Sequence, residues 1–155
     1  MSRTASIQVR GTQEVAAALA RFGAEVTAEV SKAVMATALE ALTDVRKAIQ
    51  GPPKTGKLYP RGKNNDKVHQ ASAPGEAPAT DTGALVSSTY LTQPDAMTAA
   101  IGSRLEYAAH LEFGTMKIAP RPSWIPAAER AAPRLQKRLE RVIAQAKARA
   151  ERTTK

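Results

Sequence analysis

Apolar residues recur every three or four positions through the N-terminal third of the chain. The repeating positions are Val15, Leu19, Phe22, Val26, Val30, Val34, Ala38, Leu42, Val45 and Ile49. This spacing puts them on one face of a helix. Thr12 is a suitable N-cap, and Gly51-Pro52-Pro53 would end the helix because proline donates no backbone hydrogen bond. The pattern predicts one long amphipathic helix over residues 12–49.

A second helical pattern occupies the C-terminal part of the chain, with Ser123 as its predicted N-cap. Its predicted apolar stripe runs through Ile125, Ala128, Ala132, Leu135, Leu139, Val142 and Ala146. Its other face carries Arg130, Arg134, Lys137, Arg138, Arg141, Lys147, Arg149 and Arg152. We expect Pro133 to kink or re-initiate this helix, and residues 146–155 to fray as a basic tail.

Shorter patterns between the helices favour strands and one brief helix. Residues 84–92 and 96–103 are β-compatible, and Gln93-Pro94-Asp95 between them suits a turn, which predicts an antiparallel hairpin. Residues 105–113 predict a short helix that Gly114 ends. Alternation of Ile7 and Val9 with polar neighbours predicts a short strand over residues 2–10.

Residues 51–80 show no hydrophobic period. They are dense in Pro, Gly, Lys, Asn and Ser, a composition that buries too little apolar surface to offset the entropy of ordering. We interpret them as a long polar loop that orders on assembly with a partner. The complete pattern predicts one α+β domain over residues 1–155: a long N-terminal helix, a small antiparallel hairpin sheet, a short helix and a basic C-terminal helix.

Composition narrows the chemistry of this 155-residue chain. It has no cysteine, which excludes a disulfide scaffold, a thiolate nucleophile and cysteine-ligated metals. Only 4% of the residues are aromatic, so the core must be built mainly from Ala, Val and Leu. No apolar run approaches the roughly 20 residues that a membrane span needs, and the N-terminus lacks a signal-peptide core. We therefore expect a soluble chain that acts without a membrane.

The charge of +9 is unevenly distributed along the chain. Residues 121–155 carry ten basic and three acidic side chains, and residues 51–80 carry five and two. Such an excess suits an acidic partner, which could be nucleic acid, an anionic lipid surface or an acidic protein. No stretch matches a helix-turn-helix, a zinc finger or a base-stacking platform. The alternative is a solvated helix face whose cations pair with Glu129, Glu140 and Glu151 of the same helix.

Residues for catalysis are hard to find in this sequence. His69 and His110 are the only histidines, and neither has carboxylates at a spacing typical of a metal site or a proton relay. Ser87 and Ser88 have no identifiable base. Lys57 follows a glycine, but the remainder of a phosphate-binding loop is missing. We predict no enzymatic activity, no cofactor and no metal.

Two stretches carry a more specific signal. Residues 72–85 read SAPGEAPATDTGAL, and residues 107–115 read YAAHLEFGT, followed by Ala-Pro-Arg-Pro at 119–122 and Pro-Ala at 126–127. In this order, between a long helix and a charged helix, they resemble the tailed-bacteriophage morphogenesis family named after the gene-ten product of phage HK-ninety-seven. The matching residues are Gly75, Pro78, Asp81, Thr82, Gly83, Leu85, Tyr107, Glu112, Phe113, Gly114, Arg121 and Pro122.

The chain departs from this family directly after Arg121-Pro122. Family members commonly have Phe-Leu there, whereas this chain has Ser123-Trp124-Ile125, so Trp124 is the expected hydrophobic anchor, displaced by one residue. We expect Tyr107 and Phe113 to pack between the hairpin and the helices. We also expect Glu112 to pair with Arg121 and so fix the angle of the last helix.

The resemblance implies a structural protein of the phage neck, in the connector between head and tail or in tail completion. It implies a ring of identical subunits in the particle, assembled in the host cytoplasm, with adjoining neck, connector or tail proteins as partners. We expect contacts to these partners, or to passing DNA, from the basic residues Lys54, Lys57, Arg61, Lys63, Lys67, Arg134, Arg138 and Arg141. The alternative is a basic DNA-binding module without catalytic activity.

Overall fold

The structure is a computed structural model that describes residues 23–153. It confirms the α+β class. The elements are α2 (Ala24–Gln50), β1 (Leu58–Arg61), β2 (Lys67–Gln70), α3 (Ala84–Ser87), β3 (Thr89–Asp95), β4 (Thr98–Ser103), α4 (Tyr107–Phe113) and α5 (Trp124–Thr153). The four strands form two antiparallel two-stranded sheets, β1-β2 and β3-β4.

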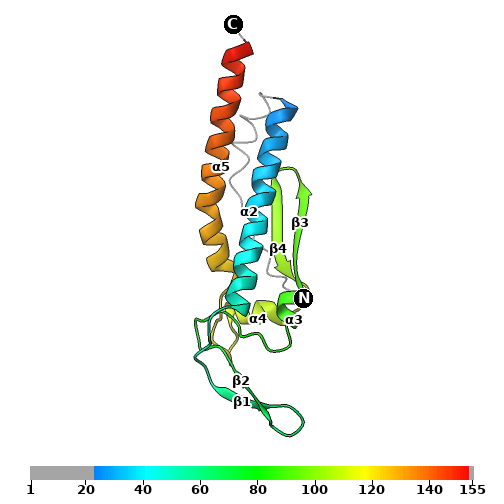
Figure 1. Cartoon of the computed structure of the whole chain (residues 1–155), viewed down its shortest axis with the longest axis vertical. Coiled ribbons are helices and arrows are strands. Elements are labelled where there is room, and N and C mark those ends of the chain that lie inside the picture. The colour runs from blue at the N-terminus through cyan, green and yellow to red at the C-terminus, as the bar shows by residue number, and fades with distance from the viewer. Residues whose placement is uncertain (1–22, 154–155) are drawn as a thin grey trace.

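The molecule is elongated because its two long helices lie side by side and antiparallel (Figure 1). The β3-β4 hairpin packs against α2, so α2 is the element that joins the layers. The short helices α3 and α4 lie where α2 ends and α5 begins. We call this end the foot; it comprises α3, α4 and residues 71–83 and 114–123. The β1-β2 hairpin extends beyond the foot, away from the long helices (Figure 1).

Two apolar clusters hold these layers together. The first lies near the foot and comprises Ala41, Leu42, Val45, Ile49, Leu85, Ile101, Ala108, Trp124, Ala127 and Ala131. The second lies farther up the helices and comprises Val26, Val30, Val34, Ala99, Leu135 and Ala146. Small alanines on both helices let the backbones approach closely, and one tryptophan supplies the largest buried apolar volume. The predicted Ala-rich core is thus what joins α2 to α5.

The N-terminal boundary of the long helix differs from the prediction. Gly23 has φ +89° and ψ 178°, which is not helical, and α2 begins at Ala24. A single helix from residue 12 is therefore wrong, because the apolar spacing continues across a glycine that breaks the helical geometry. The proposed cap at Thr12 and the proposed strand over residues 2–10 lie outside the described residues. The C-terminal end at Gln50 fits the Gly-Pro-Pro stop.

Residues 51–80 contain secondary structure that the sequence pattern did not predict. Strands β1 and β2 pair in antiparallel register, from Leu58 opposite Gln70 to Arg61 opposite Lys67. Gly62 at φ +88° helps the connecting turn reverse the chain. The hairpin forms through backbone pairing and a local turn, and its side chains are almost all exposed. Hydrophobic periodicity cannot detect such an element because neither face is buried in a core.

The second hairpin is shifted toward the C-terminus relative to its prediction. Residues 84–87 form α3 instead of strand, and β3 runs through Gln93-Pro94-Asp95. The turn follows at residues 96–97, where the Asp95 carboxylate accepts the backbone N–H of Met97 at 2.8 Å. An irregularity in the register between Thr92 and Asp95 accommodates Pro94, which has no N–H for the ladder. The short helix predicted over residues 105–113 is confirmed as α4.

The last helix begins where predicted, but its buried stripe and its end differ. Trp124, Ala127, Ala131 and Leu135 are buried, whereas Ile125 is exposed, so the first turns are rotated by one residue from the predicted stripe. Pro133 lies inside one continuous helix and does not re-initiate it. Residues 146–153 are helical rather than frayed. Packing of Ala146 against α2 extends the ordered helix beyond what its polar composition suggested.

Candidate functional site

The two motif stretches meet at the foot. The backbone N–H of Gly75 donates to the carbonyl of Pro120 at 2.9 Å. The side chain of Arg121 donates through Nε to the carbonyl of Ser72 at 3.1 Å, and its backbone N–H donates to Leu111 at 2.6 Å. Residues about fifty positions apart in the sequence are thus tied into one unit. Ser72 opens the first motif stretch, but it was not singled out from the sequence because it contributes a backbone carbonyl, which carries no side-chain signal.

Glu112 lies at the centre of this unit and is only 2% exposed. Its Oε2 accepts the backbone N–H groups of Ser123 at 2.7 Å and Trp124 at 3.1 Å, and its Oε1 accepts that of Ile125 at 2.7 Å. The first N–H groups of a helix lack partners within the helix and carry partial positive charge, so a carboxylate stabilises them. Glu112 therefore caps α5 from a different helix.

This geometry corrects two predictions. The predicted pair of Glu112 with Arg121 is wrong, because the carboxylate binds the N-terminus of α5 and the guanidinium binds a carbonyl. Ser123 is not the cap, since its Oγ is buried without a hydrogen-bond partner in the described part of the chain. Glu112 does bind the start of the last helix, through the backbone N–H groups of Ser123, Trp124 and Ile125 instead of through Arg121.

The remaining motif residues fall into buried and exposed groups. Pro78, Leu85 and Trp124 are buried, and Pro122 is half-buried. Gly75 and Gly83 both have positive φ. The Oγ1 of Thr82 accepts the N–H of Ala84 at 3.3 Å, directly before α3. The predicted packing of Tyr107 and Phe113 between hairpin and helices is wrong, because these rings are 44% and 61% exposed.

Gly114 shows why this turn needs a glycine. Its φ of +76° lies in the region that side chains disfavour. A Cβ atom there would lie 2.7 Å from the carbonyl oxygen of Ile118 and 2.9 Å from a ring carbon of Pro120. Both neighbours belong to the segment that leads from α4 into α5. The glycine therefore permits the tight approach that brings Glu112 to the start of α5.

A hollow of about 340 Å³ opens at the foot, next to this unit. Its lining includes the motif residues Pro78, Asp81, Thr82, Gly83, Leu85, Tyr107 and Arg121. His69 also lines it, with Nδ1 3.9 Å from the carboxylate of Asp81. Within residues 23–153 no group of three or more His, Asp or Glu side chains is placed to hold a metal ion. This volume lies near the lower end of the roughly 300–1,000 Å³ that ligand pockets in proteins have.

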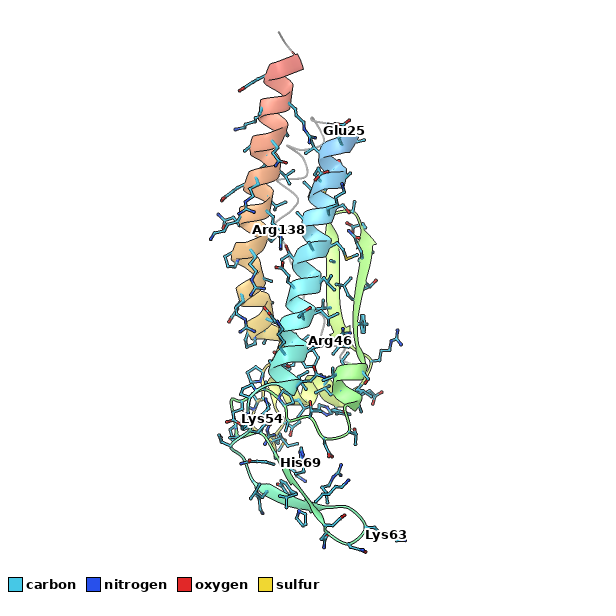
Figure 2. The ribbon with its side chains drawn as sticks, in the orientation of Figure 1. Glu25, Arg46, Lys54, Lys63, His69 and Arg138 are labelled. Atoms are coloured by element: carbon cyan, nitrogen blue, oxygen red, sulfur yellow. The ribbon has the colours of Figure 1, made fainter. Side chains whose placement is uncertain are left out.

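The basic residues of the segment between α2 and α3 are partly engaged within the chain. Lys54 donates to the carbonyl of Ala48 near the end of α2 at 2.8 Å, and burial lowers the pKa of its ammonium. Lys57 lies over the ring of Tyr59 at 5.8 Å from the centroid. Arg61 forms an ion pair with Asp81. Lys63 and Lys67 are exposed, with Lys63 at the far end of the hairpin (Figure 2).

The basic face of α5 is turned in part toward α2. Arg138 hydrogen-bonds to Glu40 and to Thr37 Oγ1 at 2.8 Å (Figure 2 labels Arg138). Arg134 pairs with Asp44 at 2.9 Å, whereas Arg141 is exposed. These ion pairs join the two helices, in contrast to the predicted pairs with acidic residues of α5 itself. The sequence contains a signal for these ion pairs. Glu40 and Asp44 lie four residues apart on one helix, and Arg134 and Arg138 lie four residues apart on the other, so each pair shares one helix face.

The Glu40 carboxylate makes this helix contact pH-dependent. The hydrogen bond from Arg138 lowers the pKa of Glu40 below its ordinary 4.5. A lowered pKa in the folded state stabilises the fold above pH 4.5, and this contribution is lost as the pH falls through the folded-state value. We expect Glu40→Gln to cost about 1 kcal/mol or less at pH 7, because the pair is partly exposed.

This difference between wild type and Glu40→Gln should shrink on acidification from pH 5 to pH 3, measured by urea unfolding at each pH. Glu129→Gln is the matched control, since Glu129 is exposed on α5. A pH-independent difference would contradict the assigned role of Glu40.

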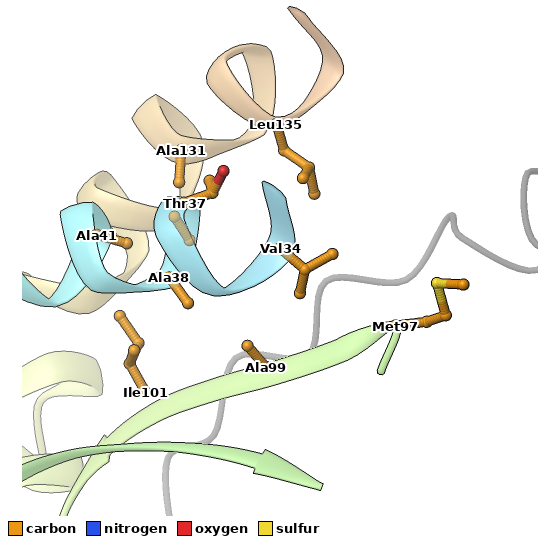
Figure 3. Close-up of a pocket in the computed structure, with 10 residues that line it drawn as sticks. Val34, Thr37, Ala38, Ala41, Met97, Ala99, Ile101, Ala131 and Leu135 are labelled. Carbon is orange, nitrogen blue, oxygen red and sulfur yellow. The ribbon is translucent and has the colours of Figure 1, made fainter. Parts of the chain in front are cut away.

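An apolar groove lies between α2, β4 and α5, on the side of α2 shown in Figure 3. Its lining is dominated by small and aliphatic side chains, including Val34, Ala38, Ala99, Ile101 and Leu135. The enclosed space is only about 40 Å³, close to what one or two water molecules occupy. The groove is therefore a small gap that short core side chains leave between the packed elements. Thr37 is the one polar residue in its lining.

No protein-family model, no curated protein and no solved structure matches this chain. Among residues 23–153, no helix combines the length and the hydropathy needed to cross a membrane. The fold and the site thus define an elongated α+β protein. Hydrogen bonds join its two motif stretches at the foot, and the β1-β2 hairpin projects beyond the foot.

Proposed function

We propose that this protein is a structural subunit of the neck of a tailed phage or prophage, acting in head–tail joining or tail completion as part of a ring. The observation that carries the proposal is the meeting of the two motif stretches at the foot, through Gly75 with Pro120 and Arg121 with Ser72. The family resemblance rests on two motifs that lie in separate segments of the sequence. If both motifs serve one structural role, they should contact each other in the fold, and they do so at the foot.

The distribution of polar groups supports a structural role over a catalytic one. The most buried carboxylate, Glu112, is fully engaged in capping α5, and the Arg121 side chain ties two loops together. These groups hold backbone in place. In the proposed ring, a rigid foot presents the projecting hairpin and the exposed rings of Tyr107 and Phe113 to neighbouring proteins.

A DNA-binding module is the competing proposal, and the ion pairs weigh against α5 as its contact surface. Arg134 and Arg138 are held by Asp44 and Glu40 of α2, which neutralises part of the charge that DNA would need. Lys63 and Lys67 are exposed on the hairpin, and two lysines by themselves neutralise few phosphates. Lys137, Arg141 and Lys147 are also exposed on α5, so a direct titration with DNA has to decide between the two proposals.

The deciding experiment measures native mass across protein concentration, alone and with portal-side and tail-side proteins of the same phage added in turn. We expect a closed ring, formed alone or templated by one of these partners. A parallel titration with duplex DNA at several salt concentrations tests the competing proposal. A chain that stays monomeric with both partners, yet binds duplex with a steep salt dependence, would overturn the neck proposal.

A further inference from the structure

We propose that the β1-β2 hairpin is a hinged wall of the hollow at the foot, and that the Asp81 carboxylate holds this wall closed. When Asp81 releases the hairpin, the strands move away from the foot and the hollow opens. The device needs only the chain itself, so it does not depend on the neck proposal. Asp81 belongs to the first motif stretch, and this contact is the role that we assign to its side chain.

The hairpin takes no part in the core of the molecule. Neither apolar cluster includes a residue of β1 or β2. His69 is the one residue of these two strands that is not exposed. An element that buries little apolar surface gains little free energy from packing, so its position depends on its polar contacts.

The polar contacts of both strands converge on one carboxylate. The guanidinium of Arg61 donates to Oδ2 of Asp81, and Nδ1 of His69 lies 3.9 Å from Oδ1 of the same residue. Arg61 is in β1 and His69 is in β2, and the strand register puts them on the same face of the hairpin. In residues 23–153 no other ion pair or side-chain hydrogen bond joins either strand to the foot.

The base of the hairpin is held differently, by a second carboxylate. Glu76 accepts the backbone N–H groups of Thr55 at 3.1 Å and Ala73 at 2.8 Å, and also the hydroxyl of Thr55. The N–H of Gly56 donates to the carbonyl of Ala71 at 2.9 Å. These bonds join the segment that enters β1 to the segment that leaves β2. A fixed base with a single contact farther out is the arrangement of a hinged element.

The contact with Asp81 is also part of the wall of the hollow. His69 and Asp81 both line this space of about 340 Å³, together with Leu85 and Arg121 of the motif stretches. Figure 2 shows His69 where the hairpin meets the foot. Separation of His69 from Asp81 would therefore widen the entrance of the hollow and give solvent or a partner access to the motif residues within it.

The strength of the contact suits a reversible device. The side chains of Arg61 and Asp81 are 45% and 37% exposed. An ion pair with this exposure changes an equilibrium by about 5-fold or less, and salt weakens it further. Asp81 thus favours the closed position without locking it.

The chain has no cysteine, so two introduced cysteines can carry spin labels without background. Lys63→Cys labels the far end of the hairpin and Lys47→Cys labels the last turn of α2; both lysines are exposed. The width of the distance distribution between the labels is measured by pulsed electron paramagnetic resonance in the full chain. We expect a narrow distribution at low salt.

Asp81→Asn should broaden this distribution at least 2-fold. Arg61→Gln removes the partner on the hairpin and should do the same, and the double variant should be no broader than either single one, because both changes break one contact. Raising sodium chloride from about 0.05 M to about 1 M should broaden the wild type and leave Asp81→Asn unchanged. Asp95→Asn is the matched control, since Asp95 is exposed at the far end of β3 and asparagine keeps an oxygen for the N–H of Met97.

A second measurement reports the opening of the hollow itself. Ala79 lines the hollow and is half-buried, so Ala79→Cys places a thiol in its wall. Addition of Asp81→Asn should raise the rate of its reaction with a maleimide about 3-fold, within what a partly exposed ion pair can supply. The reactivity of Leu39→Cys, which is 56% exposed on α2, should not change.

The outcomes decide the proposal in both directions. Far-UV circular dichroism and the melting temperature check that each variant is folded, and the hairpin lies outside the apolar clusters that hold the long helices. A broad distribution in the wild type at low salt would overturn the proposal, as would equal widths for wild type, Asp81→Asn and Arg61→Gln. Equal broadening by Asp95→Asn would show general loosening and would overturn it too. Broadening without a faster reaction at Ala79→Cys would overturn the assignment of the hairpin as a wall of the hollow.

Discussion

Glu112→Ala is expected to lower the free energy of unfolding by about 3 kcal/mol, because it leaves three N–H groups at the start of α5 without their acceptor. Two of these groups belong to the buried residues Ser123 and Trp124, so water cannot replace the lost bonds without opening the foot. Glu112→Gln keeps one carbonyl acceptor but loses the charge, and about half of that effect is expected. Urea unfolding followed by the fluorescence of Trp124 measures both.

Glu106→Gln is the matched control for this prediction. Glu106 directly precedes α4, is exposed, and makes no capping hydrogen bond. We expect its replacement to change stability by less than about 0.5 kcal/mol. If Glu112→Ala were as stable as Glu106→Gln, the assignment of Glu112 as the cap of α5 would be wrong.

Trp124→Ala should cost about 4 kcal/mol, the typical loss for truncating a large buried aromatic. Trp124 is 2% exposed and lies in the apolar cluster that joins α2, α3, β4 and α5 near the foot. Its cluster includes Ala41, Ala108, Ala127 and Ala131, whose short side chains cannot extend into the cavity that the substitution leaves. Thermal unfolding followed by far-UV circular dichroism measures the change, since the variant has no tryptophan.

The neighbouring residue provides the control for the helix register. Ile125 is 39% exposed, so Ile125→Ala should cost less than about 1 kcal/mol. The stripe predicted from the sequence placed Ile125 in the core and would have given Ile125→Ala the larger cost of truncating a buried aliphatic side chain. Comparable losses for both variants would contradict the register of α5 in the structure.

The sequence predicted which residues belong to the candidate site, but it did not predict which contacts these residues make. The motifs identified Glu112, Arg121 and Trp124 as important, and all three tie α5 to the foot. The predicted pairing of Glu112 with Arg121 followed from opposite charge and closeness in sequence. A helix N-terminus also attracts a carboxylate, but its partial charge comes from backbone groups that no residue type reveals.

The hairpin over residues 58–70 illustrates a different limit of prediction from the sequence. Its strands pair through backbone atoms and bury almost none of their side chains, so no alternation of polar and apolar residues marks them. The composition correctly indicated that this segment lacks a core of its own. Whether it forms a loop or a ladder depended on turn geometry at Gly62 and Asn65.

The sequence by itself determined the α+β class, the two long amphipathic helices and the short helix α4, because helical periodicity and proline or glycine stops are local properties. Only the tertiary structure decided the phase of α5, the partners of its arginines and the cap at its start. These depend on which residues from α2 and α4 come to lie against it, such as Asp44 and Glu112. Contacts between segments far apart in the chain are set by packing of the whole core, which local spacing does not encode.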